Sequence, residues 1–134
     1  MTDPRAIVRQ AREGPVPANW RVFTKRRGKV SGFLHRTSHD PDPLLVITPD
    51  AVIEYVDEHK PVTVVEFGEL SEIDLRMTGQ SFSDSSRVSL SVWLDLRFRD
   101  GGSRGWRSVS FADDLHVIQG FIEAYGAHKA ARGR

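Results

Sequence analysis

The densest run of positive charge in the chain lies between residues 21 and 36, and side chains of this kind bind phosphate groups. Guanidinium groups pair with phosphate oxygens as planar forks and ammonium groups as point charges, on lipid or on nucleic acid. A run of like charge is also typical of a solvated turn, or of a counterweight to the acidic segment 50–74. Both interpretations stay open. The basic members of the run are Arg21, Lys25, Arg26, Arg27, Lys29 and Arg36.

A second group of residues carries the atom types that ligate metals: His35, His39, Asp40 and Asp42. The Asp-Pro-Asp-Pro segment at 40–43 is stiff, and its spacing matches no zinc or calcium motif. Cysteine is absent from the chain, which excludes disulfides, thiolate zinc sites and a cysteine nucleophile. We therefore expect neither a metal nor another cofactor.

A serine-rich segment is the nearest approach to a nucleophile. A catalytic serine needs a base and an orienting acid in contact with it. The segment 79–83 lacks the second glycine of a nucleophile elbow, and 26–29 lacks the residues that complete a phosphate-binding loop. We expect the chain not to be an enzyme, and a small-ligand or enzyme pocket is the least favoured interpretation. The residues concerned are Ser81, Ser83, Asp84, Ser85, Ser86 and the distant His116.

Trp93 lies between Ser91 and Asp95, at positions that a strand turns toward water. A large aromatic side chain is unusual on such a face. Either another element covers it, for which an N-terminal helix is the obvious candidate, or it anchors a binding partner. Trp93 is therefore a candidate binding residue beside Arg21, Lys25, Arg26, Arg27 and Lys29.

The elements that position these residues are mostly short strands. Segments 20–24 and 30–36 fit a hairpin, and 30–36 favours a strand, while 18–27 fits either a strand or a helix. Further on, runs of β-branched and apolar residues bounded by Pro, Gly and Asp indicate strands. These runs are 44–48, 51–56, 62–67 and 71–77.

The clearest periodic pattern covers residues 87–99. Strict alternation of apolar and polar residues predicts a strand with one buried face and one solvated face. Asp100-Gly101-Gly102 then forms a hairpin turn, and 104–111 returns as an antiparallel strand. The residues expected on the buried face are Val88, Leu90, Val92, Leu94, Leu96 and Phe98.

Two helices flank the strands. Residues 2–14 form a short helix that Thr2 or Asp3 caps and that needs a surface to pack on. Residues 113–127 form an amphipathic helix, followed by a basic tail at 128–134 that we expect to fray. The apolar stripe expected on this helix is Leu115, Ile118, Phe121, Ile122 and Tyr125.

The chain is thus expected to be mainly β in an α+β arrangement. About seven antiparallel strands form a bent sheet or partly open barrel, with a C-terminal helix as cap and a short N-terminal helix. At 134 residues it is one domain, 1–134. Within it we expect a basic N-terminal extension at 1–29, a main folded part at 30–127 and the tail at 128–134.

Strand order and turn residues resemble the PH-like superfamily, which includes GRAM and bacterial PH-like domains. Leu-Val-Ile-Thr at 45–48 with 51–55 is similar to the second and third strands of such domains, and 62–67 with 70–73 to the next step. Residues 94–98, Asp100-Gly101 and 106–111 are similar to their closing hairpin. The resemblance covers about residues 30–127 and implies a non-catalytic scaffold that presents loops to lipid headgroups, peptides or proteins. Where its lipid-binding members are basic, the segment 37–43 is acidic.

Charge is unevenly distributed along the chain. The net charge is +1, made up of +7 over residues 1–36, −9 over 37–84 and +3 over 85–134. Two copies could match these opposite blocks, so we expect a protein partner or a homodimer. The alternative is weak binding of anionic lipid or nucleic acid through 21–36. No apolar run reaches the roughly 20 residues of a transmembrane helix, and no apolar signal core is present, so we expect a cytoplasmic protein.

Overall fold

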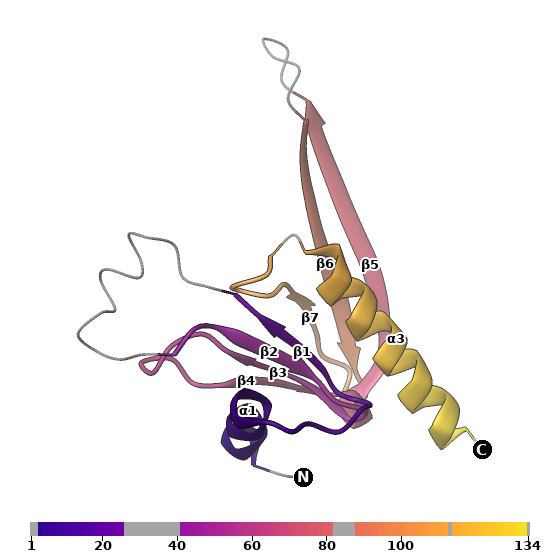
Figure 1. Ribbon diagram of the computed structural model, residues 1–134. Coiled ribbons are helices and arrows are strands. Elements are labelled where there is room, and N and C mark those ends of the chain that lie inside the picture. Colours follow the sequence, from indigo (N-terminus) through magenta and orange to yellow (C-terminus); the bar gives the residue numbers. More distant parts are fainter. Residues whose placement is uncertain (1–2, 26–40, 82–87, 113, 134) are drawn as a thin grey trace.

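The computed structural model describes residues 3–25, 41–81, 88–112 and 114–133 (Figure 1). This part of the chain is mainly β, with one helix before the strands and one after them, as the sequence predicts. The elements are α1 (Pro4–Glu13), β1 (Arg21–Thr24), β2 (Leu44–Ile47), β3 (Ala51–Tyr55), β4 (Thr63–Glu66), the 3-10 helix η1 (Phe67–Glu69), β5 (Leu70–Ser81), β6 (Val88–Phe98), β7 (Ser103–Trp106) and α3 (Leu115–Arg132).

The strands form two antiparallel sheets rather than one barrel. Strands β1-β2-β3-β4 make a four-stranded sheet and β5-β6-β7 a three-stranded sheet, each in sequence order. The helix η1 carries the chain from one sheet to the other, and the Phe67 N–H donates to the Asp50 carbonyl at 2.9 Å. The expected partly open barrel is therefore not found, because β4 and β5 do not pair within the described residues.

Helix α1 packs on the outer face of the four-stranded sheet. Asp3 caps the helix by accepting a hydrogen bond from the Arg5 N–H at 3.1 Å, as the sequence predicts. Gly14, at a φ of +52°, ends the helix. Its apolar side is buried against β2 and β3, in a cluster made of Ile7, Val8, Leu44, Val46, Ala51 and Ile53.

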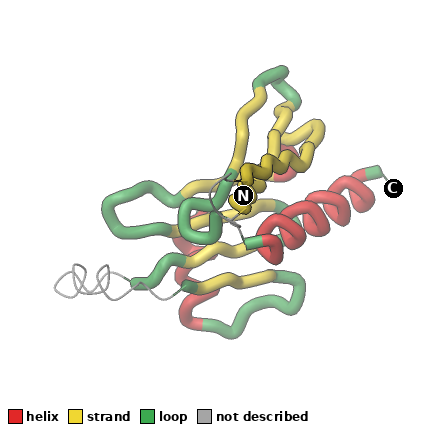
Figure 2. The backbone as a smooth tube through the Cα atoms, turned by 90° about the horizontal axis from the view of Figure 1, so that it is seen from above, coloured by secondary structure: helices red, strands yellow, loops and turns green. Residues whose placement is uncertain are grey.

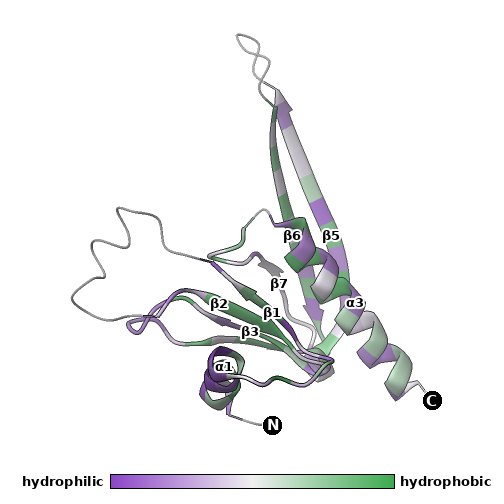
Figure 3. Cartoon of the chain, viewed as in Figure 1, coloured by the Kyte–Doolittle hydropathy of each residue, from purple (hydrophilic) through white to green (hydrophobic). Residues whose placement is uncertain are grey.

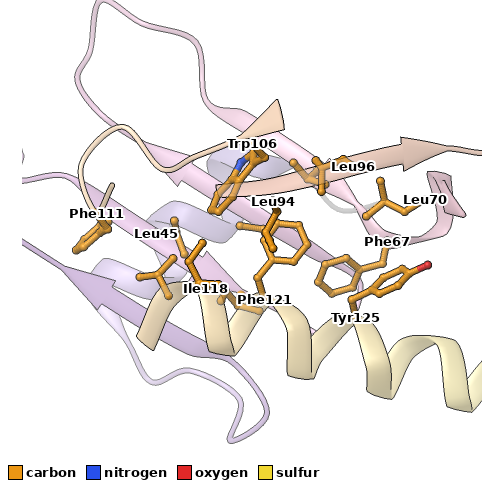
Figure 4. Close-up of a cluster of buried hydrophobic side chains, with 14 of the residues drawn as sticks. Leu45, Phe67, Leu70, Leu94, Leu96, Trp106, Phe111, Ile118, Phe121 and Tyr125 are labelled. Atoms are coloured by element: carbon orange, nitrogen blue, oxygen red, sulfur yellow. The ribbon is translucent and has the colours of Figure 1, made fainter. Parts of the chain in front are cut away.

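The main core lies between the two sheets and α3. Strand β2 is buried on both faces, since alternate residues face α1 and α3, which explains its uninterrupted apolar run. Phe67 lies at the centre, with its ring centroid 5.7 Å from that of Phe121. The Trp106 ring lies on the Phe121 ring at 4.9 Å and is tilted from it by 59° (Figure 4). This packing places Trp106, whose face the alternation does not define, in the core.

Helix α3 is longer than the sequence predicts and turns a slightly different side to the core. It runs to Arg132 instead of ending at residue 127, and its C-terminal end extends beyond the strands (Figures 1 and 2). Ile118, Phe121 and Tyr125 are buried as expected. Leu115 and Ile122 are 61% and 37% exposed, which corrects that part of the predicted stripe.

Glu54 determines where β7 ends. Its buried carboxylate accepts hydrogen bonds from the Ser108 hydroxyl at 2.6 Å and from the Val109 and Ser110 N–H groups at 3.2 Å each. These bonds hold the chain after Trp106 against β3 and away from β6. The predicted strand 104–111 is therefore only four residues long, Ser103–Trp106.

Strands β5 and β6 continue together beyond the rest of the fold (Figure 1). We call residues 75–81 of β5 and 88–93 of β6 the arm, because β7 pairs with β6 only from Leu94 onward. The remainder of the described chain is called the body. Segment 18–27, which fits either strand or helix, contains β1 paired with β2, whereas the expected strand 30–36 lies outside the described residues.

Candidate interaction surface

One face of the arm carries apolar side chains that nothing in the described chain covers. Leu75 lies opposite Leu94 and Met77 opposite Val92, and directly paired residues share a face. The exposed fractions are 51% for Leu75, 58% for Met77, 57% for Leu90 and 64% for Val88. The alternation predicts the face of Val88 and Leu90 correctly but not their burial.

The exposure has a simple geometric cause. The apolar face of β6 is continuous from the body into the arm, and Figure 3 shows hydrophobic positions recurring along both lengths. In the body, Leu94 and Leu96 are fully buried in the main core, which α3 and the four-stranded sheet complete. Beyond Leu94 the arm leaves that cover behind, and Val92 alone among its described residues is buried.

The opposite face of the same two strands is a ladder of ion pairs. Arg76 donates to Asp95 at 2.6 Å, and this bond raises the pKa of Arg76. Arg97 lies 3.4 Å from Glu72 and 3.7 Å from Asp74. These pairs are exposed and contribute little to stability, but they mark this face as the solvated one.

Trp93 lies on this charged face, half-buried and opposite Arg76. Its indole lies beside Gly105 of β7, where a built β-carbon would be in ordinary van der Waals contact with Trp93 Cδ1 at 3.6 Å. Helix α1 packs on β2 and β3 instead, so the expected cover of Trp93 by the N-terminal helix is wrong. The candidate anchor Trp93 and the apolar face of the arm therefore point in opposite directions.

The described part of the basic run is engaged with the body. Arg21 forms an ion pair with Glu123 of α3 at 2.5 Å, and this hydrogen bond is the main cause of the lowered pKa of Glu123. The Lys25 ammonium donates to the Ser110 carbonyl at 2.9 Å. The other candidates, Arg26, Arg27 and Lys29, lie outside the described residues, as does Arg36. Among the residues described, the structure assembles no basic cluster from this run.

Two surface grooves have volumes of about 520 and 530 Å³. The first lies between α3 and the turn that joins β2 to β3, and both basic and acidic side chains line it. There Asp50 Oδ1 lies 3.6 Å from Nδ1 of His128, whose ring packs against Phe67. The second lies beside Lys25 and Phe111. The first groove has no serine among its described lining residues. The second is lined by Ser110, Lys25 and Asp114, but there the Lys25 ammonium is bound to the backbone carbonyl of Ser110.

Among residues 3–25, 41–81, 88–112 and 114–133, no group of three or more acidic or histidine side chains is placed to hold a metal ion. Of the residues with metal-ligating atom types, His35, His39 and Asp40 lie outside this part, as do Ser83, Asp84, Ser85 and Ser86 of the serine-rich segment. In the same part of the chain, no helix has the length and apolar character needed to cross a membrane.

Comparison of the sequence with models of protein families finds no match, and comparison with curated proteins finds no similar sequence.

The arm is the surface on which the described residues depart furthest from the packing of the body. Its exposure cannot be found by reading periodicity alone. The signal that could have found it is length, because β6 is predicted to be much longer than its partner at 104–111.

Proposed function

We propose that this chain is a non-catalytic interaction module of PH-like type that binds protein, either a different partner or its own copy. One observation carries the proposal: the apolar face of the arm, where four large side chains are each more than half exposed. Contiguous exposed apolar surface of this kind marks interaction sites. A series of antiparallel strands followed by a C-terminal helix is also the order of elements that the PH-like resemblance implies.

Photo-crosslinking inside the producing cells tests this function. A photoreactive amino acid replaces Met77 on the arm, and a matched variant carries it at Val109, which is equally exposed but lies on the loop after β7. We expect protein adducts, including adducts to the same chain, from position 77 and far fewer from position 109. Adducts at neither position, or equal yields at both, would contradict the proposal.

A further inference from the structure

In the arm, one edge of β6 pairs with β5, and the other edge has no strand beside it among the described residues. Strand β7 pairs with β6 from Leu94 to Arg97 and then turns away, because the Glu54 carboxylate binds the chain after Trp106. Among the described residues, none forms a strand against 88–93 on that side. Edges of this kind present unpaired N–H and C=O groups and are templates for another strand.

Proteins usually protect such edges with charged side chains, proline or bulges. The outer strand of this sheet follows that rule up to residue 76, since β5 carries Glu72, Asp74 and Arg76. Residues 88–92 of β6 contain none of these devices: the segment is uncharged, lacks proline and glycine, and pairs with β5 without a bulge. Its backbone is therefore available for pairing.

The sequence of this edge reads the same in both directions: Val88-Ser89-Leu90-Ser91-Val92. When two copies of such a segment pair antiparallel about a two-fold axis at Leu90, Leu90 lies opposite Leu90, Val88 opposite Val92, and Ser89 opposite Ser91. Apolar residues then meet apolar residues on one face, and serines meet serines on the other. Like-with-like cross-strand pairs of this kind stabilise a sheet.

We infer that the partner of the arm is a second copy of this chain, bound by antiparallel pairing of β6 with β6 through residues 88–92. The contact is isologous, the commonest symmetry of soluble dimers, and joins the two three-stranded sheets into one. It also doubles the apolar face, since Leu75, Met77, Val88 and Leu90 of both copies come to lie on the same side. This inference rests on the proposed function and names its partner.

Light scattering coupled to size exclusion tests the pairing over a range of concentrations, because an interface this small belongs to the weakly associating class. We expect a dimer that Leu90→Lys shifts to monomer by at least tenfold in dissociation constant. Val109→Lys is the matched control, with a lysine at an equally exposed apolar site away from the arm, and is expected to leave the dimer intact. Circular dichroism establishes that both variants fold.

Cysteine crosslinking tests the register, since the chain has no cysteine of its own. Directly opposed residues of antiparallel strands lie about 4.5–5.5 Å apart at their Cα atoms, within disulfide range. Leu90→Cys is therefore expected to form a disulfide-linked dimer under mild oxidation. Thr78→Cys on β5 is expected not to, because three strand spacings, about 14 Å, separate the two copies of that residue.

The outcomes separate the inference from the function on which it rests. A dimer that Leu90→Lys leaves unchanged, or one that Thr78→Cys links and Leu90→Cys does not, overturns pairing through β6. A monomer at every concentration overturns the second copy as partner. In either case the photo-crosslinking at Met77 and Val109 still decides separately whether the arm binds protein.

Discussion

The body and the arm share the same two strands, yet they bury their apolar side chains very differently. In β6, Leu94 and Leu96 are completely buried, whereas Leu90 and Val88, on the same face of the same strand, are more than half exposed. The alternation is unbroken between them. A period of two therefore defines which face is apolar, while a second layer of structure decides whether that face is buried.

The largest expected effect comes from placing the same charge on both sides of this boundary. Leu94→Asp introduces an unpaired carboxylate into the main core, which costs several kcal/mol, so we expect the chain to unfold at 25 °C. Leu90→Asp should change the unfolding free energy by less than about 0.5 kcal/mol in the monomer, as is typical of exposed positions. Circular dichroism and thermal melts at low concentration distinguish the two. Equal destabilisation would show that the arm is covered as fully as the body.

The next effect tests what separates β7 from the arm. Glu54→Ala removes the acceptor of one hydroxyl and two backbone N–H groups, and we expect a loss of about 2–4 kcal/mol in urea unfolding. The control is Glu72→Ala, which removes an exposed carboxylate with one weak ion pair and should cost less than about 1 kcal/mol. Similar losses for the two variants would mean that Glu54 does not hold the loop after β7.

Two glycines of α3 test how closely the helix must approach the body to cover it. A β-carbon at Gly120 would lie 3.0 Å from Ile47 Cδ1, so Gly120→Val should push the helix away and cost about 1–3 kcal/mol. A β-carbon at Gly126 meets nothing within 4 Å, and Gly126→Ala should stabilise the chain by about 0.5–1 kcal/mol. Urea unfolding measures both, and opposite signs are the expected result. A gain from Gly120→Val would refute close packing of α3 on β2.

The smallest expected effects concern two exposed carboxylates of opposite behaviour. Arg21 lowers the pKa of Glu123, so this group stabilises the fold above its unfolded pKa, and the contribution is lost as the pH falls through the lowered value. At η1, Glu66 raises the pKa of Glu69 by hydrogen bonding and by repulsion. The contribution of Glu69 is present at low pH and is lost as the pH rises through the raised value.

Two isosteric variants separate these carboxylates. We compare each variant with the unmodified chain at the same pH. Glu123→Gln should lose more stability at pH 7 than at pH 3, whereas Glu69→Gln should gain more stability at pH 7 than at pH 3. Thermal melts across this pH range measure both differences. Changes of the same sign in the two variants would be inconsistent with the two opposite shifts in pKa.

Several features of the fold follow from short stretches of sequence. Asp3 and Gly14 mark the ends of α1, and the Asp100-Gly101-Gly102 turn forms as expected, with Gly101 at a φ of +97°. The apolar runs at 44–47 and 51–55 are strands. In each case the signal is a cap, a turn or a periodicity within a few residues, so no distant contact is needed to produce it.

The errors concern contacts between residues far apart in sequence. The strand 104–111 is cut short by a bond between Ser108 and Glu54, and 54 positions separate these residues. The N-terminal helix packs on β2 and β3 instead of covering Trp93, whose indole lies beside Gly105 on the neighbouring strand. Neither partner can be identified from the periodicity of its own segment.

For this protein, the sequence by itself determined the order of the described strands and helices, the apolar face of β6 and the palindrome at residues 88–92, because these depend on local geometry and on residue type. Tertiary structure alone decided that the palindrome lies on an open edge. The reason is that an edge is open where the neighbouring strand ends. Here β7 pairs with β6 only from Leu94 onward, because Glu54 binds the chain after β7.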